Sequence, residues 1–97
     1  MTQRAAAWQA WMHEHHDLTA TEKLLVEEGA QCISAIDTAR TEREELVVDG
    51  RYANSSRLNP LVVAESRARN DLLRVLSALG QHHPTRITDE EMAALLD

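Results

Sequence analysis

A histidine-rich segment, a single cysteine and a run of arginines are the parts of this 97-residue sequence best suited to chemistry. In the segment HEHHD, His13 and His16 lie three residues apart, and His13 and Asp17 four apart, so on a helix they could share one metal ion. The segment also lies where a first helix is expected to end, and histidines there stabilise the negative end of the helix dipole. We favour the dipole role and predict no metal site.

Cys32 is the only cysteine, so no intrachain disulfide is possible. It lies within an apolar helical stripe and has no catalytic motif around it, which favours packing over nucleophilic chemistry. The sequence contains no glycine-rich phosphate loop, no hydrolase elbow and no convincing carboxylate pair. We therefore predict no catalytic residue, no cofactor and no enzymatic activity.

The arginines suggest a nucleic-acid contact, although the formal net charge of −6 argues against a general polyanion binder. Arginine is suited to bidentate contacts with phosphates and bases. The candidate DNA-binding residues are Arg51, Arg57, Arg67, Arg69 and Arg74. The pairs Glu65–Arg69 and Arg67–Asp71 have opposite charges four residues apart, which a solvated, salt-bridged helix face also explains. No pair of short helices forms a recognisable helix-turn-helix, so major-groove recognition by that motif is not predicted.

Helices must position these side chains, because apolar residues recur at three- and four-residue steps along most of the chain. A first helix is predicted over residues 3–16. A capping box from Thr19 to Glu22 begins a second, over residues 19–44. Its apolar stripe contains Gly29, a small residue that would allow a packed neighbour to approach closely. The apolar residues of the stripe are Leu25, Cys32, Ile33, Ile36 and Ala39.

The segment after the second helix differs from its surroundings. Three β-forming residues, Leu46 to Val48, precede Asp49-Gly50, and this pattern predicts a β-hairpin and loop over residues 45–58. Asn59 and Pro60 then predict a third helix over residues 60–79, with Asn59 as its N-cap.

Gly80 is expected to end the third helix. Thr88 and Glu91 form a second capping box before a short acidic helix over residues 88–97. The predicted fold is therefore a mainly α single domain over residues 1–97. Two long antiparallel helices are joined by a β-hairpin, with a short helix at each end.

Self-association is predicted because aliphatic residues dominate the packing and only 3% of residues are aromatic. A chain of this length leaves apolar surface uncovered as a monomer, and copies of itself would cover it. The candidate interface residues are Leu46, Val47, Val48, Tyr52, Trp8 and Trp11. No apolar run approaches the roughly 20 residues of a membrane span, and the N-terminus lacks the apolar core of a signal peptide, so we predict no membrane association and a cytoplasmic protein.

The order of these features resembles a family. Residues 18–86 contain a striped helix, LVVDG, a polar loop, LNPLVVAESRARNDLLRVLSALG, and then Pro84 and Arg86. This order is similar to that of small terminase subunits of tailed bacteriophages, specifically a short family found in phages and prophages. The positions that carry the resemblance are Gly50, Asn59, Pro60, Leu79, Gly80, Pro84 and Arg86.

The resemblance implies a role in viral genome packaging in the host cytoplasm. Small terminase subunits form homo-oligomeric rings, recognise viral double-stranded DNA and recruit the large terminase subunit, which holds the ATPase and nuclease. The C-terminal helix would dock on the large subunit through Met92, Leu95 and Leu96, or it would pack back on its own ring. The alternative function, from another class, is a dimeric helical protein-interaction adaptor or antitoxin-like regulator.

Overall fold

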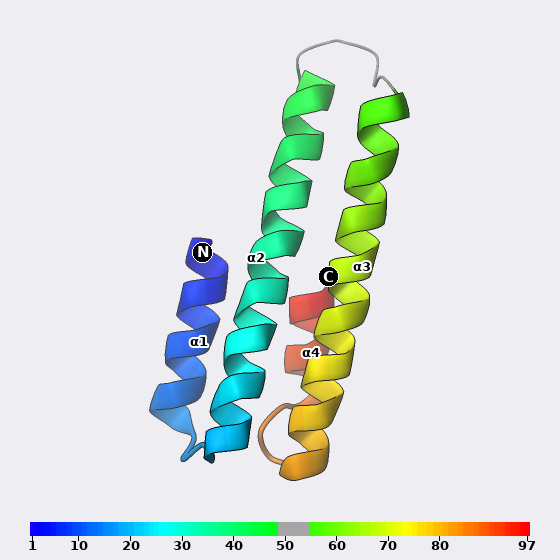
Figure 1. Ribbon diagram of the computed structural model, residues 1–97. Coiled ribbons are helices and arrows are strands. Elements are labelled where there is room, and N and C mark those ends of the chain that lie inside the picture. The colour runs from blue at the N-terminus through cyan, green and yellow to red at the C-terminus, as the bar shows by residue number, and fades with distance from the viewer. Residues whose placement is uncertain (49–54) are drawn as a thin grey trace.

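The computed structural model describes the backbone of residues 1–48 and 55–97, and the side chains of residues 1–46 and 60–97. The described residues form four helices and no strand, so the mainly α prediction is confirmed (Figure 1). The helices are α1 (Gln3–His15), α2 (Ala20–Val48), α3 (Ser55–His82) and α4 (Asp89–Leu96). Within the described part of the chain, no helix combines the length and apolarity that a bilayer crossing requires.

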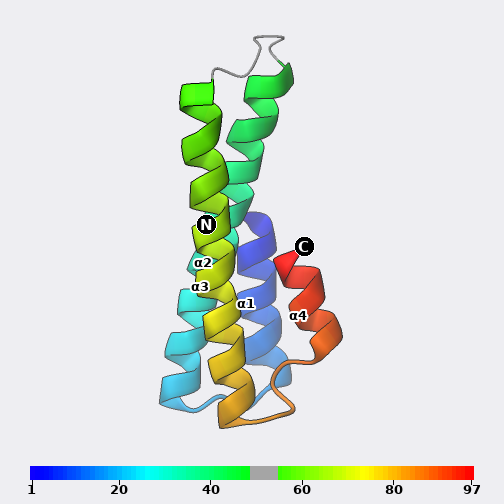
Figure 2. The same cartoon turned by 90° about the vertical axis from the view of Figure 1, so that its right-hand side faces the viewer.

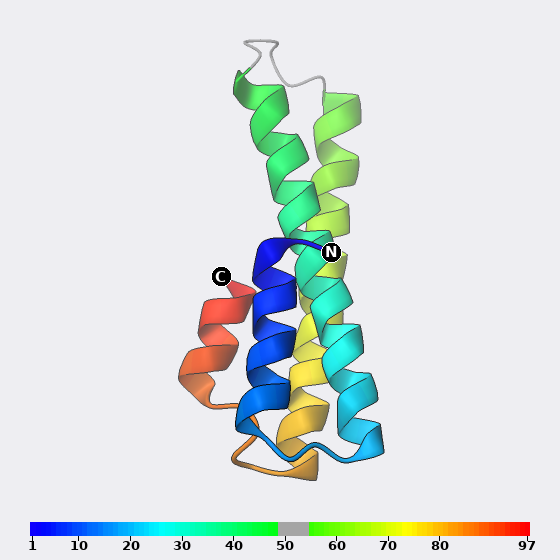
Figure 3. The ribbon, with the colours of Figure 1, turned by 90° about the vertical axis from the view of Figure 1, so that its left-hand side faces the viewer.

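The two long helices, α2 and α3, run antiparallel and side by side along the 48 Å length of the molecule. The short helices lie on one side of this pair, with α1 packed on α2 and α4 packed on α3 (Figure 2). The C-terminal part of α2 and the N-terminal part of α3 extend past both short helices (Figure 3). We call this part the projecting end, and it has neighbours on fewer sides than the rest of the fold.

The core lies where α1, α2 and α3 meet. Its fully buried large side chains are Met12, Val26, Ile33, Ile36, Leu72, Leu76 and Leu79. Each of the three helix starts that has described side chains has a threonine cap. Thr2 accepts from the Ala5 amide and Thr88 accepts from the Glu91 amide. Thr19 forms the complete predicted capping box, because its hydroxyl accepts from the Glu22 amide while the Glu22 carboxylate accepts from the Thr19 amide.

Gly29 fulfils the role that its place in the apolar stripe predicts. A Cβ atom at this position would lie 3.0 Å from two carbons of the Trp8 ring and 3.3 Å from Cγ1 of Val75. The indole of α1 and a side chain of α3 therefore meet directly over the α2 backbone. The absence of a side chain at residue 29 sets how closely these three helices approach.

The prediction that a hairpin strand includes Leu46, Val47 and Val48 is wrong, because these are the last residues of α2. β-branched residues lose only a few tenths of a kcal/mol in a helix relative to better helix formers. The helical hydrogen-bond ladder that begins at Ala20 extends over them despite their β-propensity. Asp49-Gly50 and the expected second strand lie outside the described residues.

The expected limits of the third helix are also wrong. α3 begins at Ser55, so Asn59 is not its N-cap and Pro60 lies inside the helix. Pro60 has no amide hydrogen to donate to the Ser56 carbonyl, so α3 lacks one backbone hydrogen bond there. The helix nevertheless includes the five residues before Pro60. At the other end α3 continues through Gly80 to His82, because glycine costs only about 1 kcal/mol inside a helix and need not end it.

Candidate functional site

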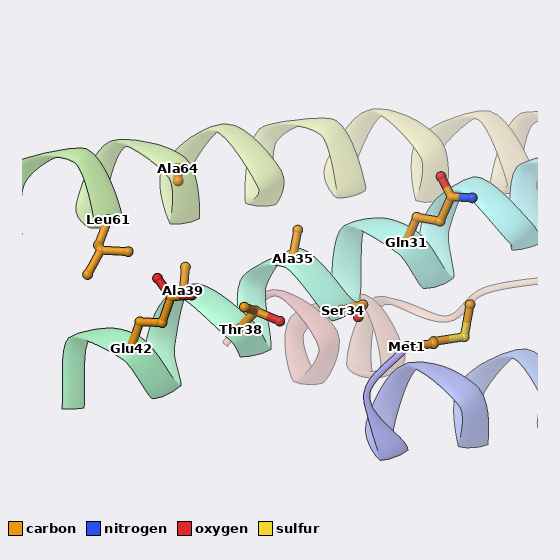
Figure 4. A pocket seen from close by; sticks show the side chains of 9 residues that line it. All are labelled: Met1, Gln31, Ser34, Ala35, Thr38, Ala39, Glu42, Leu61 and Ala64. Carbon is orange, nitrogen blue, oxygen red and sulfur yellow. The ribbon is translucent and has the colours of Figure 1, made fainter. Parts of the chain in front are cut away.

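A groove on the exposed face of α2 is a hollow that several elements line together. It has a volume of about 520 Å³ and is open to solvent along its length. Figure 4 shows it between the N-terminal residue, the outer face of α2 and one edge of α3. Its lining residues, which define the α2 groove, are Met1, Gln31, Ser34, Ala35, Thr38, Ala39, Glu42, Leu61 and Ala64.

The lining of the α2 groove is mostly small and apolar, with an acid at one end. Ala35 and Ala64 are exposed, and Met1 is 67% exposed. Glu42, also exposed, forms no ion pair with any side chain that the structure describes. Such a surface offers shape, apolar contact and one negative charge, which suits the side of another helix better than a small polar substrate.

A buried carboxylate links the two long helices, α2 and α3, at the base of the projecting end. Glu65 of α3 is 4% exposed and accepts from Arg40 and Arg43 of α2, both at 2.7 Å. Arg69, one turn along α3, lies 3.4 Å from the same carboxylate, as its i,i+4 spacing predicts. Burial alone would raise the pKa of Glu65, but the hydrogen bond from Arg40 and the charges of the neighbouring arginines outweigh it and lower the pKa below its ordinary value.

A second buried ion pair fastens the opposite end of the molecule. Arg86, in the loop before α4, donates to the Glu22 carboxylate at 2.6 Å and to the Asp17 carbonyl at 2.8 Å. Glu22 is 3% exposed, and it also accepts from the Thr19 amide. The hydrogen bond from Arg86 is the main reason that the pKa of Glu22 falls to about 2, against the opposing effect of burial.

We expect this pair to make the fold acid-sensitive. The pKa of Glu22 is lower in the folded chain than in the unfolded chain, so its contribution is complete above about pH 4.5 and is lost as the pH falls towards about 2. The difference from the ordinary value corresponds to at most about 3 kcal/mol of unfolding free energy. Urea unfolding at several pH values between about 2 and 6 measures it.

The variant Glu22→Gln provides the control, because it has no proton to gain in this range. Its unfolding free energy should fall less steeply below about pH 4.5 than that of the wild type. Equal acid slopes in the two proteins would show that Glu22 is not the group responsible.

The expected docking residues of α4 face their own chain. Met92, Leu95 and Leu96 are half-buried and pack against the core. The C-terminal end of α4 is held by two arginines, because Arg4 donates to the Leu95 carbonyl at 3.3 Å and Arg40 donates to the backbone oxygen of Asp97. The apolar side of α4 is therefore covered within its own chain.

The expected interface residues are placed unevenly. Trp8 is 9% exposed in the core, so it has little surface to offer a partner, whereas Trp11 is 37% exposed and stacks on His15 with ring centroids 4.6 Å apart. Leu46 is half-buried at the projecting end. Val47 and Val48 lie in α2 with side chains outside the described set, and Tyr52 lies outside the described residues.

The candidate DNA-binding arginines separate into two groups. Arg69 is half-buried and engaged with Glu65, whereas Arg67 and Arg74 are exposed on the outer face of α3. Arg74 lies 3.6 Å from Asp71 in an exposed pair, and such pairs contribute little. Arg57 lies in α3 with its side chain outside the described set, and Arg51 lies outside the described residues. Of the five candidates, two therefore have described side chains that solvent reaches freely.

The structure also places the histidines and the cysteine considered above. Among the residues that the structure describes, no three His, Cys, Asp or Glu side chains gather closely enough to hold a metal ion. Cys32 is half-buried, and burial together with the nearby Asp71 and Glu28 carboxylates raises the pKa of its thiol. A raised pKa lowers the thiolate fraction, which is the reactive form.

The α2 groove and the Glu65 network are the features that sequence reasoning missed. Glu65 was assigned a local pairing with Arg69, and its two arginine partners from α2 lie 22 and 25 residues away along the chain. A signal was present, because Glu65 occupies an otherwise apolar helical stripe between Leu61 and Ala68. A charged residue in such a stripe requires a buried partner of opposite charge.

Comparison with known proteins gives no relative from which a function could be transferred. No family model, no curated protein and no solved structure matches the chain.

Proposed function

We propose that this protein is a small terminase subunit of viral genome packaging. It is a non-catalytic homo-oligomer, forms a ring in the host cytoplasm, binds viral double-stranded DNA and recruits the large terminase ATPase-nuclease. The resemblance carried by the segments LVVDG and LNPLVVAESRARNDLLRVLSALG supports the family.

The observation that carries the proposal is the uncovered α2 groove beside the projecting end. Small terminase subunits act as assemblies, and such a subunit needs a surface that its own chain leaves open. Here α1 and α4 leave the α2 groove open to solvent, and its lining includes the exposed Ala35 and Ala64. Val62 and Val63, at 41% and 55% exposure, add apolar surface on α3 nearby. Self-association would remove these side chains from water.

DNA binding is proposed through many weak phosphate contacts, one set for each copy in the assembly. Exposed Arg67 and Arg74 are the described side chains open to such a contact, with Arg51 and Arg57 as further candidates. Repetition around a ring multiplies contacts that are weak in a single copy, and it accommodates the net charge of −6.

The test is the mass of the purified assembly with and without duplex DNA, measured by light scattering at about 50 and 200 mM salt. We expect a mass well above that of a dimer, and DNA binding that weakens steeply as salt rises. The variant Arg74→Gln should weaken binding to all sequences and reduce the salt dependence. Lys23→Gln, which removes an exposed cation from α2, should leave binding unchanged.

A single folded chain at micromolar concentration would overturn the proposal, and so would DNA binding that does not respond to salt. A stable dimer without DNA affinity would instead support the alternative, a dimeric helical adaptor or antitoxin-like regulator. The α2 groove is compatible with that alternative, because one partner copy is enough to cover it.

A further inference from the structure

We infer that the α2 groove of one copy binds the outer face of α3 of the next copy, with Arg67 paired with Glu42 and Val63 packed beside Leu46. The inference rests on the self-association proposed above, and it names the surfaces and the residues that make the contact. It also assigns Arg67 to assembly, which leaves Arg74 as the described candidate for DNA.

The charges of the two long helices favour this pairing. α2 carries seven acidic and three basic residues, whereas α3 carries two acidic and four basic residues. A contact between α2 and a neighbour's α2 would bring together two helices of the same sign. A contact between α2 and a neighbour's α3 brings together opposite signs, and electrostatic complementarity of this kind selects partner and register.

The heights of the proposed partners along the molecule agree. Glu65 lies beside Arg40 and Arg43, which fixes the level at which α3 passes that part of α2. Arg67 is two residues from Glu65 on α3, and Glu42 lies between the two arginines on α2. When two copies stand at the same height, Glu42 and the next copy's Arg67 are therefore within about one helical turn, roughly 5 Å along the axis.

The shapes also agree. Val63 and Arg67 are four residues apart on α3, so they lie on one face, and both are exposed. The floor of the α2 groove consists of Ala35, Thr38 and Ala39, which leave room for an approaching helix (Figure 4). Because α3 of a copy at the same height runs antiparallel to α2, pairing Arg67 with Glu42 places Val63 one turn closer to the projecting end, beside the half-buried Leu46.

The geometry of the contact allows a closed assembly. Each copy offers two different surfaces, the groove on α2 and the outer face of α3, so one copy can bind a neighbour on each side. Contacts of this head-to-tail kind generate rings when the rotation between copies closes. A reciprocal pair about a two-fold axis would use the same residues but stop at two copies, and the assembly mass separates the two cases.

The test uses two charge-reversed proteins, Glu42→Arg and Arg67→Glu. Alone, each places like charges across the contact, so the concentration needed for half-assembly should rise at least ~10-fold, measured by light scattering at low salt. Mixed in equal amounts, they should assemble together, because the arginine introduced in the first variant would meet the glutamate introduced in the second. Both positions are exposed, so circular dichroism should show the wild-type helix content in each variant.

Glu14→Arg, a reversal at an exposed position on α1, is the matched control and should assemble like the wild type. Variants that assemble normally alone, or a mixture that fails to assemble, would overturn the inference. A wild-type protein that never assembles would overturn the proposed function as well. Normal assembly of Arg67→Glu with loss of DNA binding would place Arg67 at the DNA and exclude it from this contact.

Discussion

Replacing Arg86 with methionine should be the most damaging single change to the ion pairs of this protein, lowering the free energy of unfolding by about 3–5 kcal/mol. The methionine fills most of the volume but leaves the Glu22 carboxylate, 3% exposed, without its cation. The Asp17 carbonyl loses its donor at the same time. Thermal unfolding followed by circular dichroism should show a midpoint lower by more than about 10 °C.

The double variant Glu22→Leu with Arg86→Met tests the cause. It removes the stranded charge, and apolar replacements of buried ion pairs are often neutral or stabilising, so much of the lost stability should return. Arg74→Met removes a cation from the exposed pair with Asp71 and should change the midpoint little. Equal losses in Arg86→Met and Arg74→Met would contradict the importance assigned to the buried pair.

Replacing Gly29 with leucine should destabilise the fold by about 3 kcal/mol through overpacking. The new Cβ alone would lie 3.0 Å from the Trp8 ring, and the remaining side chain would have to displace that indole or Val75. Urea unfolding should show the loss, and the fluorescence spectrum of the protein should shift as Trp8 moves towards water.

Gly80→Ala is the matched control, because it too replaces a glycine inside a helix. Its Cβ would meet only Cγ2 of Ile87, at an ordinary contact distance of 3.8 Å. Relief of the glycine penalty should therefore stabilise α3 by up to about 1 kcal/mol. Destabilisation by Gly80→Ala, or stability of Gly29→Leu, would contradict the close packing described at α1, α2 and α3.

Helix type and approximate position could be predicted because they depend on local signals. The spacing of Leu72, Val75, Leu76 and Leu79 matches the buried face of α3, and Thr19 begins α2 with the capping box that its spacing to Glu22 predicts. Gly29 was correctly expected to admit a close neighbour. These features need only the helical period of about 3.6 residues and the chemistry of a helix end.

Boundaries and partners across helices could not be predicted in the same way. Leu46 to Val48 favour strands locally, but the hydrogen-bond ladder of α2 extends over them. Pro60 and Gly80 are good boundary residues, yet each is tolerated inside α3. The α2 groove depends on which faces α1 and α4 leave open, and that is a property of the packed helices which no single segment encodes.

The shared guanidinium of Arg40 has a thermodynamic consequence. It binds Glu65 at the seam between the long helices and also holds the backbone oxygen of Asp97 at the end of α4. Because one guanidinium makes both contacts, the two contacts are thermodynamically linked. Release of α4 changes the stability of the Arg40–Glu65 pair, and loss of that pair changes the stability of the Arg40–Asp97 contact by the same factor. The terminal helix and the projecting end, although far apart in sequence, therefore form a reciprocally coupled pair.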